Sequence, residues 1–131
     1  VQAGVDMFDC VLPTRMARTG SVLTWDGRLV VKNREYARDD RPIDDACPCP
    51  VCRRHSRAYL RHLFQPREVL GPMPATQHNL WFYQELMRGA RQAIGADRLA
   101  TFAREVTTRW NEGEARRLAE LARRPPGGRG R

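Results

Sequence analysis

The chain has 131 residues, of which 41% are hydrophobic and 29% are charged, enough for one domain or for part of a larger one. No apolar run approaches the roughly 18 residues that a spanning helix needs, and the first residues lack the basic and apolar regions of a signal peptide. The net charge of +8 favours a polyanionic partner, with nucleic acid first. We therefore expect a cytoplasmic protein with no membrane partner.

The first predicted element is a strand over residues 4–12, an apolar run that carries Asp9 near its end and stops at Pro13. Valine and phenylalanine in such a run are typical of a strand buried on both faces, as in a parallel sheet. Cys10 lies inside the run and is predicted to be a buried, unreactive thiol.

Asp9 and the basic residues that follow it have two interpretations each. A carboxylate at the C-terminal end of a buried strand is where α/β barrels carry catalytic groups, although an acid that pairs with an arginine or caps a turn is the simpler interpretation. Residues 13–20 are predicted to form a turn in which Arg15 and Arg18 stand three positions apart. Their guanidinium groups could hold phosphates, or they could belong to a solvated loop.

A β-hairpin is predicted next. Residues 21–25 and 28–32 are short β-prone runs, and Asp26 and Gly27 stand between them. An Asp-Gly pair between apolar runs is a strong hairpin signal. The charged segment that follows, residues 33–46, is predicted to be irregular.

Helices are predicted for most of the remaining chain, because apolar residues recur there at helical spacing. They span residues 54–64, 77–94, 97–111 and about 113–124. A proline-containing loop over residues 65–75 precedes the second helix, which Thr76 is expected to cap and Gly95 to end. Its predicted apolar face carries Leu80, Tyr83, Met87, Ala90 and Ile94.

Three of the four cysteines, Cys47, Cys49 and Cys52, are crowded into six residues. Cys47 and Cys49 are too close for an ordinary structural disulfide, so metal binding is the better interpretation. Three thiolates and one imidazole complete a tetrahedral ligand set for zinc, and four protein ligands indicate a structural site rather than a catalytic one. The simpler alternative is three reduced surface cysteines.

The fourth ligand is one of three histidines. His78 stands near the start of a predicted helix, from which its side chain could point back toward the cysteines. His55 and His62 are rival ligands, and spacing alone barely separates the three.

Taken in order, these motifs closely resemble the bacterial tRNA-guanine transglycosylases (queuine tRNA-ribosyltransferases). The resemblance rests on residues 4–15, on Ala17 to Gly20, on the cysteine cluster and on residues 55–63. It runs from about residue 1 to residue 110 and covers only about the C-terminal third of such an enzyme. It implies an α/β fold, the C-terminal portion of a (β/α)8 TIM barrel with an inserted zinc-binding subdomain.

The resemblance also implies a division of the chain. Residues 1–20 would form a late barrel strand and the catalytic loop, and residues 21–78 the β-hairpin and zinc-binding subdomain. Residues 79–124 would form the C-terminal helices. The basic tail, residues 125–131, lies outside the resemblance and is expected to be disordered because it has no core-forming residues.

The activity that the resemblance implies is base exchange at the wobble guanine of tRNAs with a GUN anticodon, with a 7-deazaguanine, the prequeuosine base, as the incoming base. Asp9 matches the nucleophile, which forms a covalent aspartyl-ribosyl intermediate. Arg15 and Arg18 match positions that bind the tRNA anticodon loop. Tyr59 and His62 match a homodimer contact. The structural zinc ion would be held by Cys47, Cys49, Cys52 and His78.

The earlier barrel strands, and with them the general acid/base and the base-binding residues, are absent from the chain, so it is expected to be catalytically incomplete alone. Two functions follow. The chain is part of an active pentosyltransferase, which the presence of Asp9 favours. Alternatively, it is a non-catalytic, zinc-stabilised tRNA-binding or dimerisation module.

Overall fold

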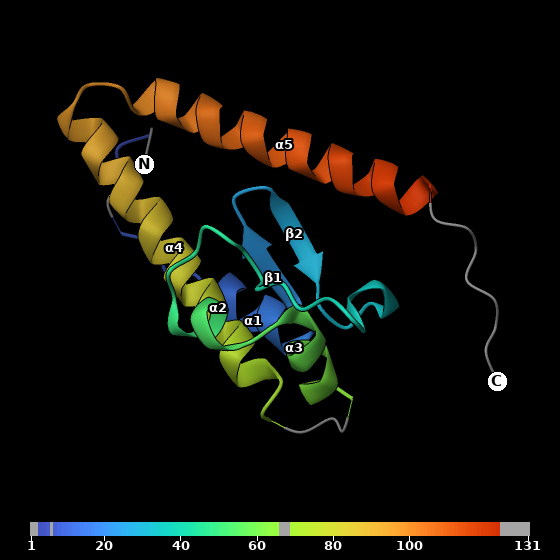
Figure 1. Ribbon diagram of the computed structural model, residues 1–131. Helices are drawn as coiled ribbons and strands as arrows, with labels where there is room; N and C mark the ends of the chain where they lie inside the picture. The colour runs from blue at the N-terminus through green and yellow to red at the C-terminus, as the bar shows by residue number, and fades with distance from the viewer. Residues whose placement is uncertain (1–2, 6, 66–68, 124–131) are drawn as a thin grey trace.

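The computed structural model describes residues 3–5, 7–65 and 69–123. Two long helices, α4 (Pro72–Gly95) and α5 (Leu99–Arg123), meet at a corner and frame a small β-hairpin (Figure 1). None of the helices in these ranges combines the length and the apolar character needed to cross a membrane. The expectation that residues 125–131 are disordered concerns residues outside those that the structure describes.

The predicted hairpin is confirmed. Strands β1 (Ser21–Thr24) and β2 (Gly27–Val30) pair antiparallel, with Thr24 opposite Gly27 at the turn. Gly27 has a φ of 110°, which a residue with a side chain rarely adopts, and this explains the Asp-Gly signal in the sequence.

Four short helices pack around the hairpin: α1 (Leu12–Arg18), the 3₁₀ helix η1 (Arg34–Tyr36), α2 (Pro50–Arg54) and α3 (Arg57–Leu63). The core lies where α1, the hairpin and α4 meet beneath the long segment between β2 and α3. Its buried members include Ala17, Val22, Leu29, Val31, Ile43, Val51, Leu60 and Ala75.

The prediction of a strand over residues 4–12 is wrong for this structure, which has no strand among residues 3–5 and 7–11. A strand buried on both faces needs a neighbour on each side, whereas the two strands within the described ranges pair only with each other. The apolar run is instead exposed: Met7 is 88% and Phe8 51% accessible. Cys10 is likewise exposed rather than buried.

The predicted turn over residues 13–20 is mostly helical. Pro13 does end the apolar run, but it lies in the first turn of α1, where its missing N–H leaves no broken hydrogen bond. Because α1 is a helix, Arg15 and Arg18 lie on one face of it, and both are exposed.

The later helices exist, with different bounds. Helix α4 begins at Pro72 rather than at Gln77, so Thr76 lies within it, and α4 crosses the expected boundary between residues 78 and 79. The two helices predicted over residues 97–111 and 113–124 are one continuous helix, α5. The overall arrangement is a mixed helix and strand fold, as the predicted α/β class requires.

Candidate metal centre

Three cysteines and one histidine come together between α2 and α4. The ligand atoms of Cys47, Cys49, Cys52 and His78 all lie within 4.8 Å of one another. Cys49 caps the N-terminus of α2, and its Sγ accepts a hydrogen bond from the backbone N–H of Cys52 at 3.4 Å. Proline in the first turn of α2 suits this tight start, so the local sequence folds two thiols back toward each other.

The distances fit a tetrahedral metal ion. The Nδ1 atom of His78 lies 3.9, 3.5 and 3.4 Å from the sulfur atoms of Cys47, Cys49 and Cys52. A zinc ion with Zn–S bonds of about 2.3 Å and a Zn–N bond of about 2.05 Å would separate sulfur and nitrogen by about 3.6 Å. The four side chains can therefore hold one metal ion with little rearrangement.

The other ring nitrogen of His78 fixes the orientation of the imidazole. Nε2 lies 2.7 Å from the carbonyl oxygen of Leu23, to which it donates its proton. This hydrogen bond leaves the lone pair of Nδ1 for the metal, the arrangement that metal-binding histidines commonly use. His78 is only 1% exposed, and Cys49 is fully buried.

The thiol and imidazole groups of the cluster shift one another's pKa values. Burial disfavours the charged imidazolium, but Cys47, Cys49 and the Leu23 carbonyl outweigh it and raise the pKa of His78 to about 9. The hydrogen bond with Cys52 lowers the pKa of Cys49, and the same contact raises the pKa of Cys52. The contact between Cys49 and Cys52 therefore favours a thiolate at Cys49, whereas a divalent ion would stabilise all three thiolates together.

Soft thiolates with one imidazole suit zinc better than magnesium or calcium, which prefer oxygen ligands. Four protein ligands leave no open coordination position for water or substrate, so the site is structural. A bound ion would tie the segment before α2 to α4 and to strand β1.

The structure resolves the choice among the histidines. Neither His55 nor His62 belongs to the cluster. His55 stacks on Tyr59 of α3, with 4.9 Å between ring centroids, and His62 is exposed on the same helix. Tyr59 is itself 45% exposed, so both predicted dimer-contact residues lie at the surface.

Asp9 lies outside the metal cluster, in the exposed segment that leads into α1. Asp9 is close in sequence to Arg15 and Arg18, which lie on helix α1, and α1 packs against α4. Among the described residues, the side chains of Asp9, Arg15 and Arg18 have no hydrogen bond or ion pair.

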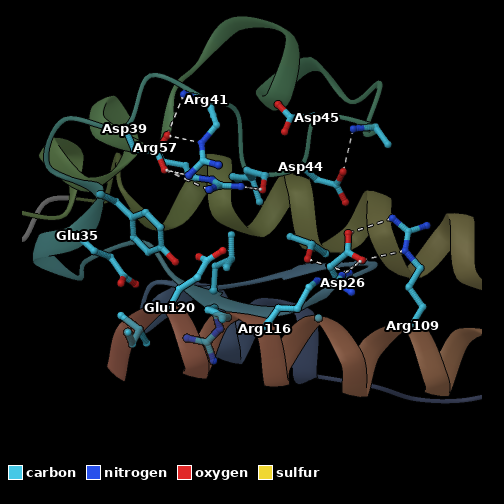
Figure 2. A pocket seen from close by; sticks show the side chains of 18 residues that line it. Asp26, Glu35, Asp39, Arg41, Asp44, Asp45, Arg57, Arg109, Arg116 and Glu120 are labelled. Carbon is cyan, nitrogen blue, oxygen red and sulfur yellow. Dashed lines mark hydrogen bonds and ion pairs between the residues drawn. The ribbon is translucent and has the colours of Figure 1, made fainter. Parts of the chain in front are cut away.

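Apart from the metal cluster, the structure has a hollow of about 400 Å³ between α5 and the segment that precedes α2 (Figure 2). Figure 2 shows Asp26 facing Arg109 and Arg116 of α5, and Asp39 facing Arg41 and Arg57. The guanidinium nitrogens of Arg109 and Arg116 lie 3.1 and 3.2 Å from Oδ1 of Asp26.

The acids in this hollow are held as carboxylates. Hydrogen bonds from Arg109 lower the pKa of Asp26, and those from Arg41 hold the pKa of Asp39 well below its usual range. The ion pairs of Asp26 with Arg109 and Arg116 join α5 to the hairpin turn. Because the guanidinium groups named here already face acids, they are not free to bind a phosphate.

One buried polar residue, Asn79, was not singled out by sequence reasoning. It is fully buried and hydrogen-bonds three backbone groups on two other segments. The signal was available, because His78 and Asn79 are adjacent polar residues in a helix whose other buried positions are apolar. The predicted apolar face placed Leu80 and Ile94 inside, whereas both are about half exposed.

Comparison with known proteins agrees with the chemistry of the cluster. Residues 1–112 match the family described as queuine tRNA-ribosyltransferase. The chain belongs to this family. It is 56% identical over 103 residues to a queuine tRNA-ribosyltransferase of Novosphingobium aromaticivorans, a match that covers 79% of the chain and 28% of that protein.

Two further relatives carry the same description. The chain is 54% identical over 114 residues to the protein from Granulibacter bethesdensis, covering 87% of the chain and 30% of the relative. It is 54% identical over 113 residues to the protein from Desulforamulus reducens, covering 86% and 30%. The chain thus spans about 30% of the length of these family members.

Proposed function

We propose that this chain is the C-terminal part of a tRNA-guanine transglycosylase that acts in queuosine biosynthesis in the cytoplasm. The enzyme exchanges the wobble guanine of tRNAs with a GUN anticodon for the prequeuosine base, a 7-deazaguanine. The observation that carries this proposal is the family match over residues 1–112, joined to a Cys₃His cluster with metal-binding geometry. The net charge of +8 suits a tRNA partner.

Asp9 is the proposed nucleophile. Its carboxylate attacks C1′ of the wobble ribose as the bond to guanine breaks, and guanine leaves with the bonding electron pair and takes up a proton. The incoming base then attacks C1′, loses a proton and releases Asp9. Two displacements keep the anomeric configuration, as in retaining glycosidases, where a plain carboxylate suffices against an oxocarbenium-like carbon.

Arg15 and Arg18 are proposed to hold the backbone of the anticodon loop. Both are exposed on one face of α1, which begins three residues after Asp9. Guanidinium groups bind phosphate oxygens through charge-assisted hydrogen bonds, so this face can orient RNA without reading its sequence. Replacing either arginine with glutamine should raise KM for tRNA more than it lowers kcat, and an unchanged KM would count against this role.

The metal has a structural role in this proposal. Zinc, when bound, supplies four strong bonds that fold the subdomain of residues 21–78. The apolar side chains of Met7, Phe8 and Val11, exposed here, would pack in a late strand of a (β/α)8 barrel completed by residues outside this chain.

A homodimer contact through Tyr59 and His62 is also proposed. Both are exposed on one face of α3, beside a largely apolar groove of about 640 Å³ lined by Tyr59, Leu63, Met73 and Leu80 among others. Exposed apolar side chains around a groove are typical of a protein interface. Tyr59→Ala should shift the sedimentation equilibrium of the complete enzyme toward monomer, and an unshifted equilibrium would exclude the contact.

The test of the main proposal is incorporation of radiolabelled guanine into a GUN-anticodon tRNA by the polypeptide that the native gene encodes. Wild-type protein should incorporate the label, and Asp9→Asn should lose at least about 10³-fold in rate while keeping its affinity for tRNA. Equal rates in the two proteins would refute the role of Asp9.

The alternative is a non-catalytic, zinc-stabilised tRNA-binding or dimerisation module. One observation favours it: Asp9 is exposed. Absence of exchange by the wild-type protein, with tRNA binding retained, would support this reading.

A further inference from the structure

The inference concerns how the metal centre and the Asp9 segment are joined. Strand β1 has one side paired with β2 and one side open. Gly20 accepts a hydrogen bond from the N–H of Val31, at 2.9 Å, on the paired side. Because residues of an antiparallel pair alternate, Ser21 and Leu23 direct their backbone groups to the open side. Open strand edges need partners when they are buried, and both residues are buried.

Helix α4 covers this open edge with two consecutive side chains. Asn79 Oδ1 accepts the N–H of Leu23 at 3.0 Å, and its Nδ2 donates to the carbonyl oxygen of Ser21, also at 3.0 Å. His78 Nε2 donates to the carbonyl oxygen of Leu23 at 2.7 Å. One strand residue, Leu23, is therefore bound on its carbonyl side by the metal-cluster histidine and on its N–H side by Asn79.

Asn79 makes one more hydrogen bond, to a different segment. Its second amide proton goes to the carbonyl oxygen of Pro13, at 3.0 Å, in the first turn of α1. Both N–H groups of the side chain are then used, and no other side chain in the described ranges hydrogen-bonds this carbonyl. With Asn79 fully buried, water cannot replace a lost bond, so the contact is rigid.

We propose that Asn79 is a positioning residue, which couples the Cys₃His centre through strand β1 to helix α1 and so sets the placement of Asp9, Arg15 and Arg18. The route runs from His78 to Leu23, from Leu23 to Asn79, and from Asn79 to Pro13. This inference rests on the proposed function, because it assigns a purpose to a segment that carries the nucleophile and the RNA contacts. It explains how a structural metal site supports chemistry at residues outside it.

The first test uses Asn79→Asp in the zinc-loaded polypeptide that the native gene encodes. Aspartate keeps the shape and the acceptor for Leu23, but as a carboxylate it has no proton for Pro13 and Ser21. Amide hydrogen exchange of residues 15–18 should become at least about tenfold faster, while zinc stays at one ion per chain. The matched control is Asn33→Asp, the same chemical change at an exposed asparagine, which should leave exchange in α1 unchanged.

The hydrogen-exchange rates and the zinc content together support or overturn the proposal. Unchanged exchange in α1 would overturn the proposal, because the Asn79 amide would then not hold the helix. Loss of zinc together with loss of protection would also overturn it, because Asn79 would then support the cluster rather than the Asp9 segment. Asn79→Ala, which removes all three bonds without adding a charge, must give the same pattern as Asn79→Asp.

The second test is kinetic and uses the polypeptide that the native gene encodes. Asn79→Asp should lower kcat for guanine exchange at least about tenfold with zinc content unchanged, whereas Asn33→Asp should match wild type. An unaltered kcat for guanine exchange, together with faster amide hydrogen exchange in α1, would refute the positioning role. If the wild-type protein exchanges no guanine, the proposed function is refuted instead, and the result on amide hydrogen exchange still stands.

Discussion

The sharpest structural prediction concerns Gly113, in the middle of α5. A methyl group there would clash with the carbonyl oxygen of Asp26 and lie 2.6 Å from its carbonyl carbon. These are backbone atoms of the hairpin turn, so no rotamer change can relieve the clash. The helix must move by about 1 Å, which also stretches the ion pairs from Arg109 and Arg116 to Asp26.

The magnitude follows from two opposing terms. Overpacking against rigid atoms costs up to about 3 kcal/mol, while alanine gains about 1 kcal/mol over glycine as a helix former. Gly113→Ala should therefore lower the free energy of unfolding by about 2 kcal/mol. With an unfolding entropy of about 2.1 cal/mol/K per residue, the chain length of 131 residues converts this to a fall in Tm of about 7 °C.

The assay is thermal unfolding of the zinc-loaded chain by circular dichroism, with Gly95→Ala as the control. Gly95 ends α4, and a Cβ there meets no atom within 4 Å, so alanine should raise Tm by about 2 °C. Glycine-to-alanine substitution is thus expected to lower Tm at position 113 of α5 and to raise Tm at position 95 of α4. A Tm that rises in both variants would refute the close packing of α5 on the hairpin turn.

Two further outcomes follow from the charges and the metal ligands. Cys49→Ser should abolish stoichiometric zinc binding, measured by inductively coupled plasma mass spectrometry. The control, Cys10→Ser, changes an exposed thiol outside the cluster and should keep full zinc content. Full zinc content in Cys49→Ser would exclude the ligand assignment. The pKa of Asp39 is lowered in the folded state, so its ion pairs stabilise the fold above the ordinary aspartate pKa of about 3.9 and are lost as the pH falls below it. The Tm difference between wild type and Asp39→Asn should accordingly be constant above about pH 5 and narrow below about pH 4. A difference that stays constant to about pH 3 would contradict this linkage. The control is Asp40→Asn, at an exposed aspartate, which should change Tm much less than Asp39→Asn at about pH 7.

The parts of the fold that the sequence predicted correctly depend on local chemistry. The hairpin follows from the need for a glycine at position 27, and the three cysteine ligands follow from their spacing. The fourth ligand did not follow from spacing, because any of the three histidines after Cys52 could fold back toward the cysteines. His78 is selected by a contact distant in sequence, the hydrogen bond to Leu23, which appears only when α4 is placed on β1.

The errors share a physical cause, which is that local signals were read without their tertiary partners. Pro13 after an apolar run predicts the end of a strand, but a proline is equally compatible with the first turn of a helix, where it lies in α1. Two helices were predicted over residues 97–111 and 113–124, whereas α5 is continuous and Gly113 allows the close approach of the hairpin turn. The strand over residues 4–12 needs neighbouring strands that the described residues do not supply.

The most direct test of the proposed function is to trap the covalent intermediate. The polypeptide that the native gene encodes would be incubated with a GUN-anticodon RNA hairpin without the incoming base, quenched in denaturant, digested and analysed by mass spectrometry. The account predicts an RNA-ribosyl adduct on the peptide that contains Asp9, absent in Asp9→Asn. An adduct on another carboxylate, or base exchange with no adduct at all, would contradict it.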